Sequence, residues 1–417
     1  MDDSKESIMA KSFIEEQVKQ IPVMGEYDTI VVGGGVAGVA AAIASARNGA
    51  KTLLLEKTYM LGGLGTAGLI AIYLPICDGN GRQVCYGIAE ELLRLSVKHG
   101  VEPGVGARHH HATPWFENGT IEEKKKERFA VEYNANVFAI LCEQLLIDEG
   151  VEILYGTTVT SASVENDKIT AVITENKSGR QAFVGKNFID ASGDADLAWQ
   201  AGALTAEYQQ GNVLASWYFE FINGVYALNM LGFADIPDKY KTPEQLANKG
   251  KRFKGLEGKE LSDMMVQSHA TLLQDYLKKG GVGKNHALAQ IASIPQIRMT
   301  RRIEGTVVLD DEPFKPYEDS VGLMTSWRKA GPVYEVPYGS LISKNIKNLS
   351  ACGRCMSATD TMWENSRVIP YCAVTGEIVG TAAAMFSDFH SADVKELQDK
   401  LRQNGLKVKY DELEPLQ

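Results

Sequence analysis

The fold is decided by residues 27–38, Tyr27-Asp28-Thr29-Ile30-Val31-Val32-Gly33-Gly34-Gly35-Val36-Ala37-Gly38. The apolar run from Tyr27 to Val32 is typical of a buried strand, and the glycines end it. An alanine-rich segment follows, and it predicts a helix from Val36 to Asn48. Residues Lys51 to Glu56 are apolar again and predict a second strand. Residues 27–56 therefore form one β-α-β unit.

The glycines of this unit have the spacing G-x-G-x-x-G. Gly33 permits the tight turn, Gly35 lets the backbone approach a pyrophosphate, and Gly38 lets the helix pack closely on the strand. The first amides of the helix, at Val36 and Ala37, then face a phosphate with the positive end of the helix dipole. The pattern predicts a dinucleotide site; the alternative is a glycine-rich turn that binds no ligand.

An acid at the end of the second strand supports the dinucleotide interpretation. Glu56 lies 23 residues after Gly33, where a carboxylate can accept hydrogen bonds from the ribose hydroxyls. An acid at this position disfavours a 2′-phosphate, so NADP is a poor candidate for the site.

Composition narrows the class of protein. The chain has 417 residues, 44% hydrophobic and 23% charged, as in a globular protein of two or three domains. Its net charge of −10 argues against nucleic acid as a partner. Six cysteines do not form a disulfide framework, and we expect a reducing, cytoplasmic location. The sequence shows no apolar signal core and no transmembrane run, so we expect no membrane partner.

Three further segments carry a family resemblance. Lys57-Thr58-Tyr59-Met60-Leu61-Gly62-Gly63-Leu64-Gly65-Thr66-Ala67-Gly68 resembles the second FAD loop of the glutathione-reductase-type fold. Phe188-Ile189-Asp190-Ala191-Ser192-Gly193-Asp194-Ala195-Asp196 resembles the strand and Ala-Thr-Gly-Asp turn of those proteins. Asn348-Leu349-Ser350-Ala351-Cys352-Gly353-Arg354-Cys355, followed by Thr375-Gly376-Glu377, resembles their C-terminal FAD segment. The set is similar to bacterial FAD-dependent oxidoreductases related to the fumarate reductase and succinate dehydrogenase flavoproteins, over most of 27–75, 130–205 and 290–390.

The resemblance implies a set of FAD-binding residues. It also implies that the start of a helix near Thr375 points at the N1–O2 edge of the flavin. Residues 57–76 contain no His, so we expect non-covalent FAD. The expected cofactor residues are Gly33, Gly35, Val36, Ala37, Gly38, Glu56, Lys57, Gly62, Gly63, Leu64, Thr66, Ala67, Val159, Ala191, Ser192, Gly193, Asp194, Gly353, Arg354, Arg367, Thr375 and Gly376.

The fold class that follows is α/β. We expect a Rossmann-like FAD-binding domain, a parallel sheet with helices plus a small antiparallel β-meander, carrying an inserted α+β substrate domain. The FAD-binding domain is discontinuous, over 25–75, 130–205 and 340–390. The substrate or cap domain comprises 76–129 and 206–339, and 391–417 forms a C-terminal helical tail. Separate strands are predicted at 180–184 and 186–189, and a helix at 375–386.

Because flavin performs the hydride chemistry, the protein has to orient the substrate and stabilise charge. Arg298 and Arg301 are the preferred substrate-orienting residues, since guanidinium groups bind carboxylates in bidentate fashion. The alternative is a set of structural salt bridges at a domain junction. His110, in a run of three histidines, is a candidate acid or base. No metal site is expected, because three consecutive residues cannot all face one way.

Cys352 and Cys355 have C-x-x-C spacing, which a redox dithiol also shows. Their place in the C-terminal flavin segment favours simple packing near the flavin instead.

The predicted function is two-electron oxidation or reduction of a small organic substrate, with a carboxylate as one candidate group. The alternatives are a flavin-dependent monooxygenase or hydroxylase and a non-catalytic FAD-binding protein; the charge disfavours an RNA modifier. No second G-x-G-x-x-G has strand–helix context, so the electron donor or acceptor is unassigned. Homo-oligomerisation stays open.

Overall fold

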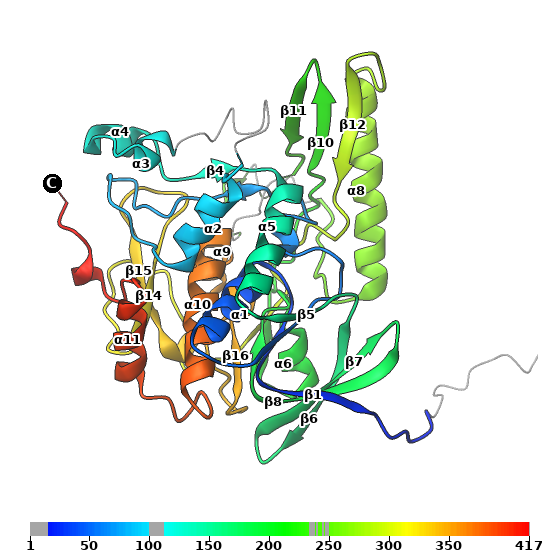
Figure 1. Ribbon diagram of the computed structural model, residues 1–417. Coiled ribbons are helices and arrows are strands. Elements are labelled where there is room, and N and C mark those ends of the chain that lie inside the picture. The colour runs from blue at the N-terminus through cyan, green and yellow to red at the C-terminus, as the bar shows by residue number, and fades with distance from the viewer. Residues whose placement is uncertain are drawn as a thin grey trace, which may run out of the picture.

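The computed structural model describes residues 16–99, 112–232, 238, 241–243, 246 and 250–416. Its central part is an α/β arrangement in which helices cover a parallel-rich sheet (Figure 1). The predicted β-α-β unit is present as β1 (Val23–Val32), α1 (Val36–Arg47) and β2 (Thr52–Leu55). β1 and β2 run parallel, with Val32 opposite Leu55. The strand order and the glycine turn place the start of α1 at the carboxyl edge of the sheet.

The main sheet has the strand order β5-β2-β1-β8-β7-β6, with β16 also paired to β8. β5, β2, β1, β8 and β16 pair in parallel, whereas β8, β7 and β6 form an antiparallel meander. The predicted combination of parallel sheet and meander is therefore confirmed. The added strands are β5 (Glu152–Leu154), β6 (Thr158–Glu165), β7 (Lys168–Asn176), β8 (Gly179–Asp190) and β16 (Leu349–Ala351).

The two strands predicted at 180–184 and 186–189 are a single strand, β8, so that prediction was wrong. β8 pairs with β1 along most of its length. On its other edge, its first half pairs with β7 and its last residues pair with β16. Gly185 interrupts the apolar pattern of the sequence, but the strand continues through it. A Cβ at this position would lie 3.0 Å from the Ile30 side chain, which explains why a glycine fits here. The glycine reflects close packing and not a turn.

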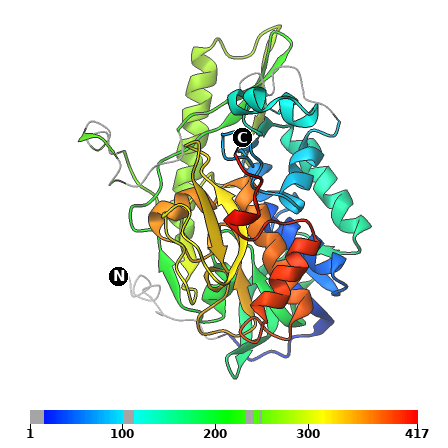
Figure 2. The ribbon, with the colours of Figure 1, turned by 90° about the vertical axis from the view of Figure 1, so that its left-hand side faces the viewer.

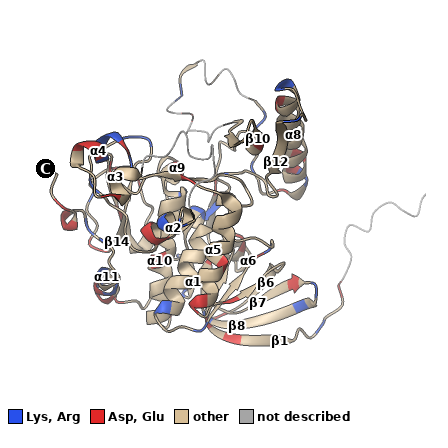
Figure 3. Ribbon diagram, turned by 45° about the horizontal axis from the view of Figure 1, so that its top comes forward, with Lys and Arg blue, Asp and Glu red and all other residues tan. Residues whose placement is uncertain are grey.

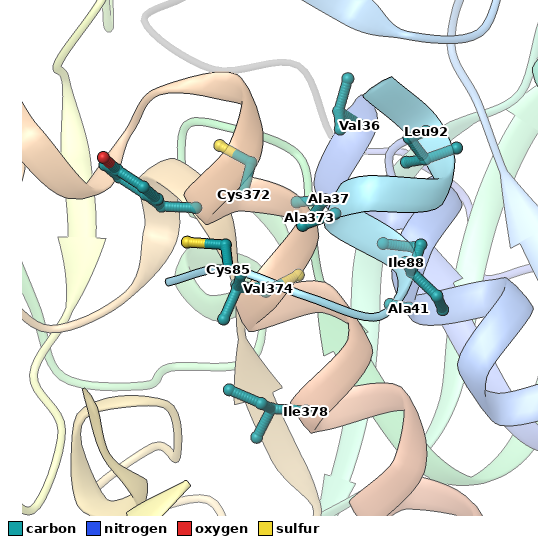
Figure 4. Close-up of a cluster of buried hydrophobic side chains, with 14 of the residues drawn as sticks. Val36, Ala37, Ala41, Cys85, Ile88, Leu92, Cys372, Ala373, Val374 and Ile378 are labelled. Atoms are coloured by element: carbon teal, nitrogen blue, oxygen red, sulfur yellow. The ribbon is translucent and has the colours of Figure 1, made fainter. Parts of the chain in front are cut away.

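Helix α10 (Ile369–Met385) packs closely along α1. A Cβ at Gly376 would lie 2.2 Å from the Ala37 carbonyl oxygen, and one at Gly380 would lie 2.1 Å from that of Ala41. Helices α2 (Ile88–Ser96) and α5 (Ala135–Asp148) complete this layer. Figure 4 shows the small side chains of α1 and α10 beside Ile88 and Leu92 of α2. The segment 76–129, assigned to the cap from the sequence, thus contributes α2 to the main core.

The helix predicted over 375–386 begins six residues earlier, at Ile369. Pro370 lies in its first turn, where a missing N–H costs nothing, so the proline does not delay the helix. As a result Thr375 and Gly376 lie inside the helix and not at its start, which corrects the sequence-based expectation.

Part of the segment 206–339 stands apart from the main sheet, whereas Val321, Leu323 and Met324 join the main core. The three-stranded sheet β11-β10-β12 stands beside the long helix α8, at the upper right of Figure 1. Figure 2 shows α8 rising above the rest, with the β14–β15 hairpin and α11 in front. The elements are β10 (Tyr218–Ile222), β11 (Val225–Asn229), α8 (Gly258–Lys278), β12 (His286–Ile291), β14 (Ser320–Thr325), β15 (Val333–Pro337) and α11 (Val394–Gln403).

Short elements connect these layers. β9 pairs with β13, and β3 pairs with β4. The predicted helical tail contains α11, whose Leu397 and Leu401 are buried. The short elements are η1 (Gly63–Gly65), β3 (Ile72–Tyr73), α3 (Thr113–Phe116), α4 (Ile121–Lys126), β4 (Val131–Glu132), α6 (Asp196–Gln200), β9 (Thr205–Glu207), β13 (Arg301–Ile303), η3 (Tyr338–Ser340), η4 (Gly353–Cys355), α9 (Asp360–Ser366) and η5 (Tyr410–Glu412).

Charges of both signs are scattered over the ribbon, and α4 carries both within two turns (Figure 3). Within the described ranges, no single helix has the length and apolarity needed to cross a membrane. α9 and α10 would meet those criteria only as a pair, and a 92° bend separates them.

Candidate cofactor and substrate site

One cavity brings together segments that are far apart in the sequence. It runs from the glycine loop after β1 to residues of the inserted segment. The expected cofactor residues that line it are Gly33, Gly35, Val36, Ala37, Glu56, Lys57, Gly62, Gly63, Leu64, Val159, Ala191, Ser192, Gly193, Asp194, Arg354 and Arg367. From the inserted segment it is lined by Gly255, Leu261, Ile294, Pro295 and Ile297.

The glycine loop has the shape that the sequence predicts. Gly33 has φ +106°, and a Cβ there would lie 2.4 Å from the Ala191 carbonyl oxygen. A Cβ at Gly38 would lie 1.8 Å from the Gly33 carbonyl oxygen. Gly35 differs, since no atom lies within 4 Å of its Cβ position. Gly33 and Gly38 permit tight packing. Gly35 leaves open space at the mouth of α1, as a bound pyrophosphate requires.

Glu56 ties the end of β2 to the glycine loop. Its Oε2 accepts a hydrogen bond from the Gly34 amide at 2.6 Å. Its Oε1 accepts from the Thr58 amide and the Thr58 hydroxyl, both at 2.7 Å. The side chain lines the cavity and is 7% exposed. Oε2 keeps a lone pair for a further donor, so the geometry fits a carboxylate that receives a ribose hydroxyl.

The turn after β8 is held from within by Asp190. One carboxylate oxygen accepts from the Ser192 amide at 3.0 Å and the Ser192 hydroxyl at 2.7 Å, and the other accepts from the Ala198 amide at 2.8 Å. Burial raises the pKa of Asp190 despite these donors. Asp190 therefore shapes the turn, and the next residues, Ala191 to Asp194, line the cavity.

Arg354 joins the C-terminal segment to the inserted one. Its Nη1 donates to the carbonyl oxygens of Ile297 and Arg298, at 2.9 and 2.8 Å. Its Nη2 lies 3.3 Å from Asp194 Oδ1. Because Arg354 also lines the cavity, it fixes the relative position of two cavity walls.

The start of α10 also faces the cavity, through Ile369. No side chain caps this helix, and its first turn contains no acid. Arg367, just before it, is 7% exposed and lies 3.3 Å from Glu364. The Nε atom of Arg367 is buried without a hydrogen-bond partner among the described residues. This part of the cavity therefore contains the unpaired N–H groups of a helix start and the guanidinium of Arg367.

Arg298 lies next to Ile297, which lines the cavity, but Arg298 itself is absent from the cavity wall. It is 6% exposed, and its Nη1 donates to the Gln296 carbonyl oxygen at 2.6 Å. Its guanidinium stands 5.5 Å from the centre of the Trp217 ring. Burial, with the charges of Arg367 and Arg354, lowers the pKa of Arg298 to about 9. No carboxylate of the described chain forms an ion pair with it.

Arg301 has a different environment from Arg298. Its Nε donates to the Asp194 carbonyl oxygen and its Nη2 to Asp196 Oδ1, both at 3.1 Å, and it stands 4.7 Å over the Trp199 ring. Arg301 is absent from the cavity wall. Its contacts match the alternative that the sequence left open, a structural ion pair, and its substrate-orienting role stays a prediction.

The remaining expected cofactor residues are absent from the cavity lining: Gly38, Thr66, Ala67, Gly353, Thr375 and Gly376. The Thr66 hydroxyl donates to the Leu61 carbonyl oxygen, and the Gly353 amide donates to Thr375 Oγ1 at 2.9 Å. The Ala67 carbonyl accepts from the Ser293 amide at 2.9 Å. His110 lies outside the described residues.

The cysteines are buried and free. Cys352 and Cys372 line the cavity, whereas Cys355 accepts a hydrogen bond from the Ala195 amide at 3.2 Å. Burial raises the pKa of all three thiols. Protonated, enclosed thiols agree with packing and not with a C-x-x-C redox dithiol.

Sequence reasoning missed two residues near the arginines. Gln296 is 3% exposed and joins three segments: its amide nitrogen donates to the Gly68 and Trp217 carbonyls, and its Oε1 accepts from the Trp217 amide. The hydroxyl of Tyr208 is buried and has no partner in the described part of the chain. Neither residue belongs to a motif, so only the tertiary structure identifies them.

The fold is that of a Rossmann-type dinucleotide-binding protein. A profile of the family described as FAD dependent oxidoreductase matches residues 28–230 and 215–401. The chain belongs to this family, and its cofactor is FAD.

Other known proteins share shorter or more distant similarity with this chain. A thioredoxin reductase from Ureaplasma parvum is 32% identical over 71 residues, which are 17% of this chain and 23% of that protein. The chain thus matches about a quarter of the length of that relative.

Solved structures cover more of the chain at lower identity. A geranylgeranyl bacteriochlorophyll reductase-like protein from Thermoplasma acidophilum is 14% identical, over 91% of this chain and 83% of that one, with a TM-score of 0.44. p-Nitrophenol 4-monooxygenase from Pseudomonas putida is 11% identical, over 90% and 83%, with a TM-score of 0.48. These likenesses are too distant to bear on the reaction.

Proposed function

We propose that this enzyme oxidises or reduces a small organic substrate by two electrons at flavin N5. The observation that carries the proposal is the continuity of one cavity from the glycine loop to the inserted segment. Bound FAD supplies the hydride chemistry, and the chain supplies binding, orientation and charge.

The cofactor end of the cavity offers suitable groups for each part of FAD. The amides at the mouth of α1, next to the open position at Gly35, would hold the pyrophosphate. Glu56 would accept the adenosine ribose hydroxyls. Among the described residues that line the cavity there is no His, and we propose that FAD is bound non-covalently.

The other end of the cavity offers charge stabilisation. The uncapped start of α10 and the adjacent Arg367 would stabilise negative charge on the N1–O2 edge of the flavin. Because the helix begins at Ile369, we assign this proposed role to the helix start at Ile369 and not to Thr375. The apolar residues Leu261, Ile294, Pro295 and Ile297 would exclude water beside it and contact the substrate.

The test is spectroscopic. Purified protein, as isolated or after addition of FAD, should show a flavin absorbance band, and acid precipitation should release the flavin into the supernatant. Under anaerobic conditions, a screen of small organic compounds should then find one that bleaches or restores the band.

Two results decide against the proposal. A folded, colourless protein that refuses added FAD would refute it outright. A hydroxylated product that forms only in the presence of O₂ would assign the chain to the monooxygenase alternative.

A further inference from the structure

Helix α8 has two apolar faces, and only one of them is buried. The buried face consists of Met264, Ser268, Leu272 and Tyr276. On the other face Val266, Leu273 and Leu277 are 68%, 49% and 58% exposed, and Ala270 is exposed between them. We call Val266, Ala270, Leu273 and Leu277 the α8 stripe.

The spacing of the α8 stripe is that of a helix-packing seam. Its residues follow one another at steps of four, three and four positions. With 3.6 residues per turn, these steps keep them in one line along the helix, about 200° around it from the buried face. Alternating steps of three and four are the pattern by which two helices pack side by side at a small crossing angle. Exposed apolar residues scattered singly need no explanation, whereas this line fits a second helix.

A second copy of α8 in antiparallel orientation matches the α8 stripe along its whole length. When Ala270 of one copy lies opposite Leu273 of the other, Val266 comes opposite Leu277, because both pairs are centred on the same point of the helix. A two-fold axis through that point makes each contact occur twice. Each pair joins a smaller side chain to a leucine, as close packing between helices requires.

The charges beside the α8 stripe favour the antiparallel orientation. Asp263 continues the line of the stripe before Val266, and its carboxylate forms an ion pair with Lys259. Lys278 is exposed at the opposite end, next to Leu277. Antiparallel packing brings Asp263 of each copy to the end of the other helix that carries Lys278, whereas parallel packing would set Lys278 beside Lys278. It also aligns the two helix dipoles head to tail.

The position of α8 leaves room for another molecule. In Figure 1 the helix stands on the outer side of the sheet β11-β10-β12, and in Figure 2 it rises above the other elements. Just beyond its end, Val282 is 82% exposed. In the antiparallel arrangement this residue would lie level with the first turn of α8 in the other copy.

We propose that two copies of this protein form a two-fold dimer through antiparallel packing of their α8 stripes. The inference is independent of the reaction proposed above. A helix of 21 residues is about 31 Å long and about 10 Å wide, so one helix pair covers less than the roughly 1,200 Å² of a standard interface. The dimer should therefore be reversible. Because Leu261 of α8 lines the cavity, dimerisation would also hold the helix that forms part of this wall.

Analytical ultracentrifugation of the FAD-loaded full chain, over a wide range of concentrations, should show a monomer–dimer equilibrium. Leu273→Glu should weaken the dimer by at least about 100-fold, because two leucines leave the interface, one from each copy. Gln267→Glu is the matched control: Gln267 is exposed on the same helix, about 90° around it from the stripe, and gains the same charge. It should dimerise like the wild type, and both variants should keep the wild-type melting temperature of the monomer.

Disulfide formation tests the orientation. The six native cysteines are buried, so mild oxidation acts on introduced thiols. Val266→Cys and Leu277→Cys are prepared as two separate proteins. Their mixture should form a disulfide-linked dimer, because residue 266 of one copy faces residue 277 of the other. Neither protein alone should do so, since its two equal thiols would lie about 16 Å apart along the helices.

Four results would overturn the proposal. A monomer at every concentration would refute the dimer, and a dimer unaffected by Leu273→Glu would place the contact elsewhere. Disulfide-linked dimers of each single variant alone would show parallel packing. Vesicles that contain anionic phospholipid supply the last arm: monomers that bind them through Leu273 without dimerising would assign the α8 stripe to a membrane surface.

Discussion

The close contact between α1 and α10 makes a sharp prediction for Gly376→Ala. A Cβ at residue 376 would lie 2.2 Å from the carbonyl oxygen of Ala37, in the first turn of α1. Ordinary contacts begin near 3.4 Å, so the helices must separate by about 1 Å at this point. Ala37 lines the cavity at the expected phosphate position, and the displacement therefore reaches the cofactor site directly.

The size of the effect follows from two opposing terms. Overpacking costs about 1–3 kcal/mol, and replacing a helical glycine with alanine returns about 1 kcal/mol. Stability should therefore fall by about 0–2 kcal/mol. The loss of one well-placed amide contact to a charged phosphate is worth about 1.5–3 kcal/mol, so the FAD Kd should rise at least about tenfold.

Gly380→Ala is the matched control. It meets the Ala41 carbonyl at 2.1 Å, one turn further from the cavity, so it should destabilise the protein similarly and change the FAD Kd much less. Urea unfolding of both apoproteins gives the stabilities, and quenching of FAD fluorescence gives the Kd values. Equal FAD affinity in Gly376→Ala and wild type would refute the reasoning.

Three further predictions follow from single contacts. Glu56→Gln replaces an acceptor of three hydrogen bonds by a group with two donors, and should raise the FAD Kd by about tenfold or more in fluorescence titrations; an unchanged Kd would count against a ribose role. Burial raises the pKa of Glu377 from 4.5 to about 8, so the folded state retains a proton that the unfolded state releases, and stability falls as pH rises through this interval. Glu377→Gln keeps an acceptor for the Ile88 amide and should raise the Tm more at about pH 9 than at about pH 5.5; equal shifts would contradict this. Asn212→Ala removes the acceptor of the Arg298 and Met299 amides and should cost about 2–4 kcal/mol in urea unfolding; a loss below about 0.5 kcal/mol would show that water replaces it.

The cofactor end of the site could be predicted because its signals are local. The turn at Gly33, the helix mouth at Gly35 and the acid at Glu56 lie within one β-α-β unit, and each needs a particular residue type at a fixed spacing. The strand end at Asp190 was recognisable for the same reason, since the turn that follows is fixed by its own side-chain hydrogen bonds.

The substrate end could not be predicted in the same way. Arg298 and Arg301 are three residues apart and look equivalent in the sequence, but only Arg301 meets carboxylate Asp196. That difference arises from partners far along the chain, at Asp194 and Asp196, which spacing does not reveal. Apolar wall residues such as Leu261 and Pro295 carry no motif at all.

The way β8 shares its edges has a consequence for biosynthesis. The last residues of β8, which lead into the Asp190 turn, pair with β16 at Leu349–Ala351. About 160 residues must therefore leave the ribosome after β8 before this wall of the cavity acquires its neighbour, and pairings over such distances form slowly. A nascent chain that ends before Leu349 would thus already contain the glycine turn and still lack a complete cofactor chamber.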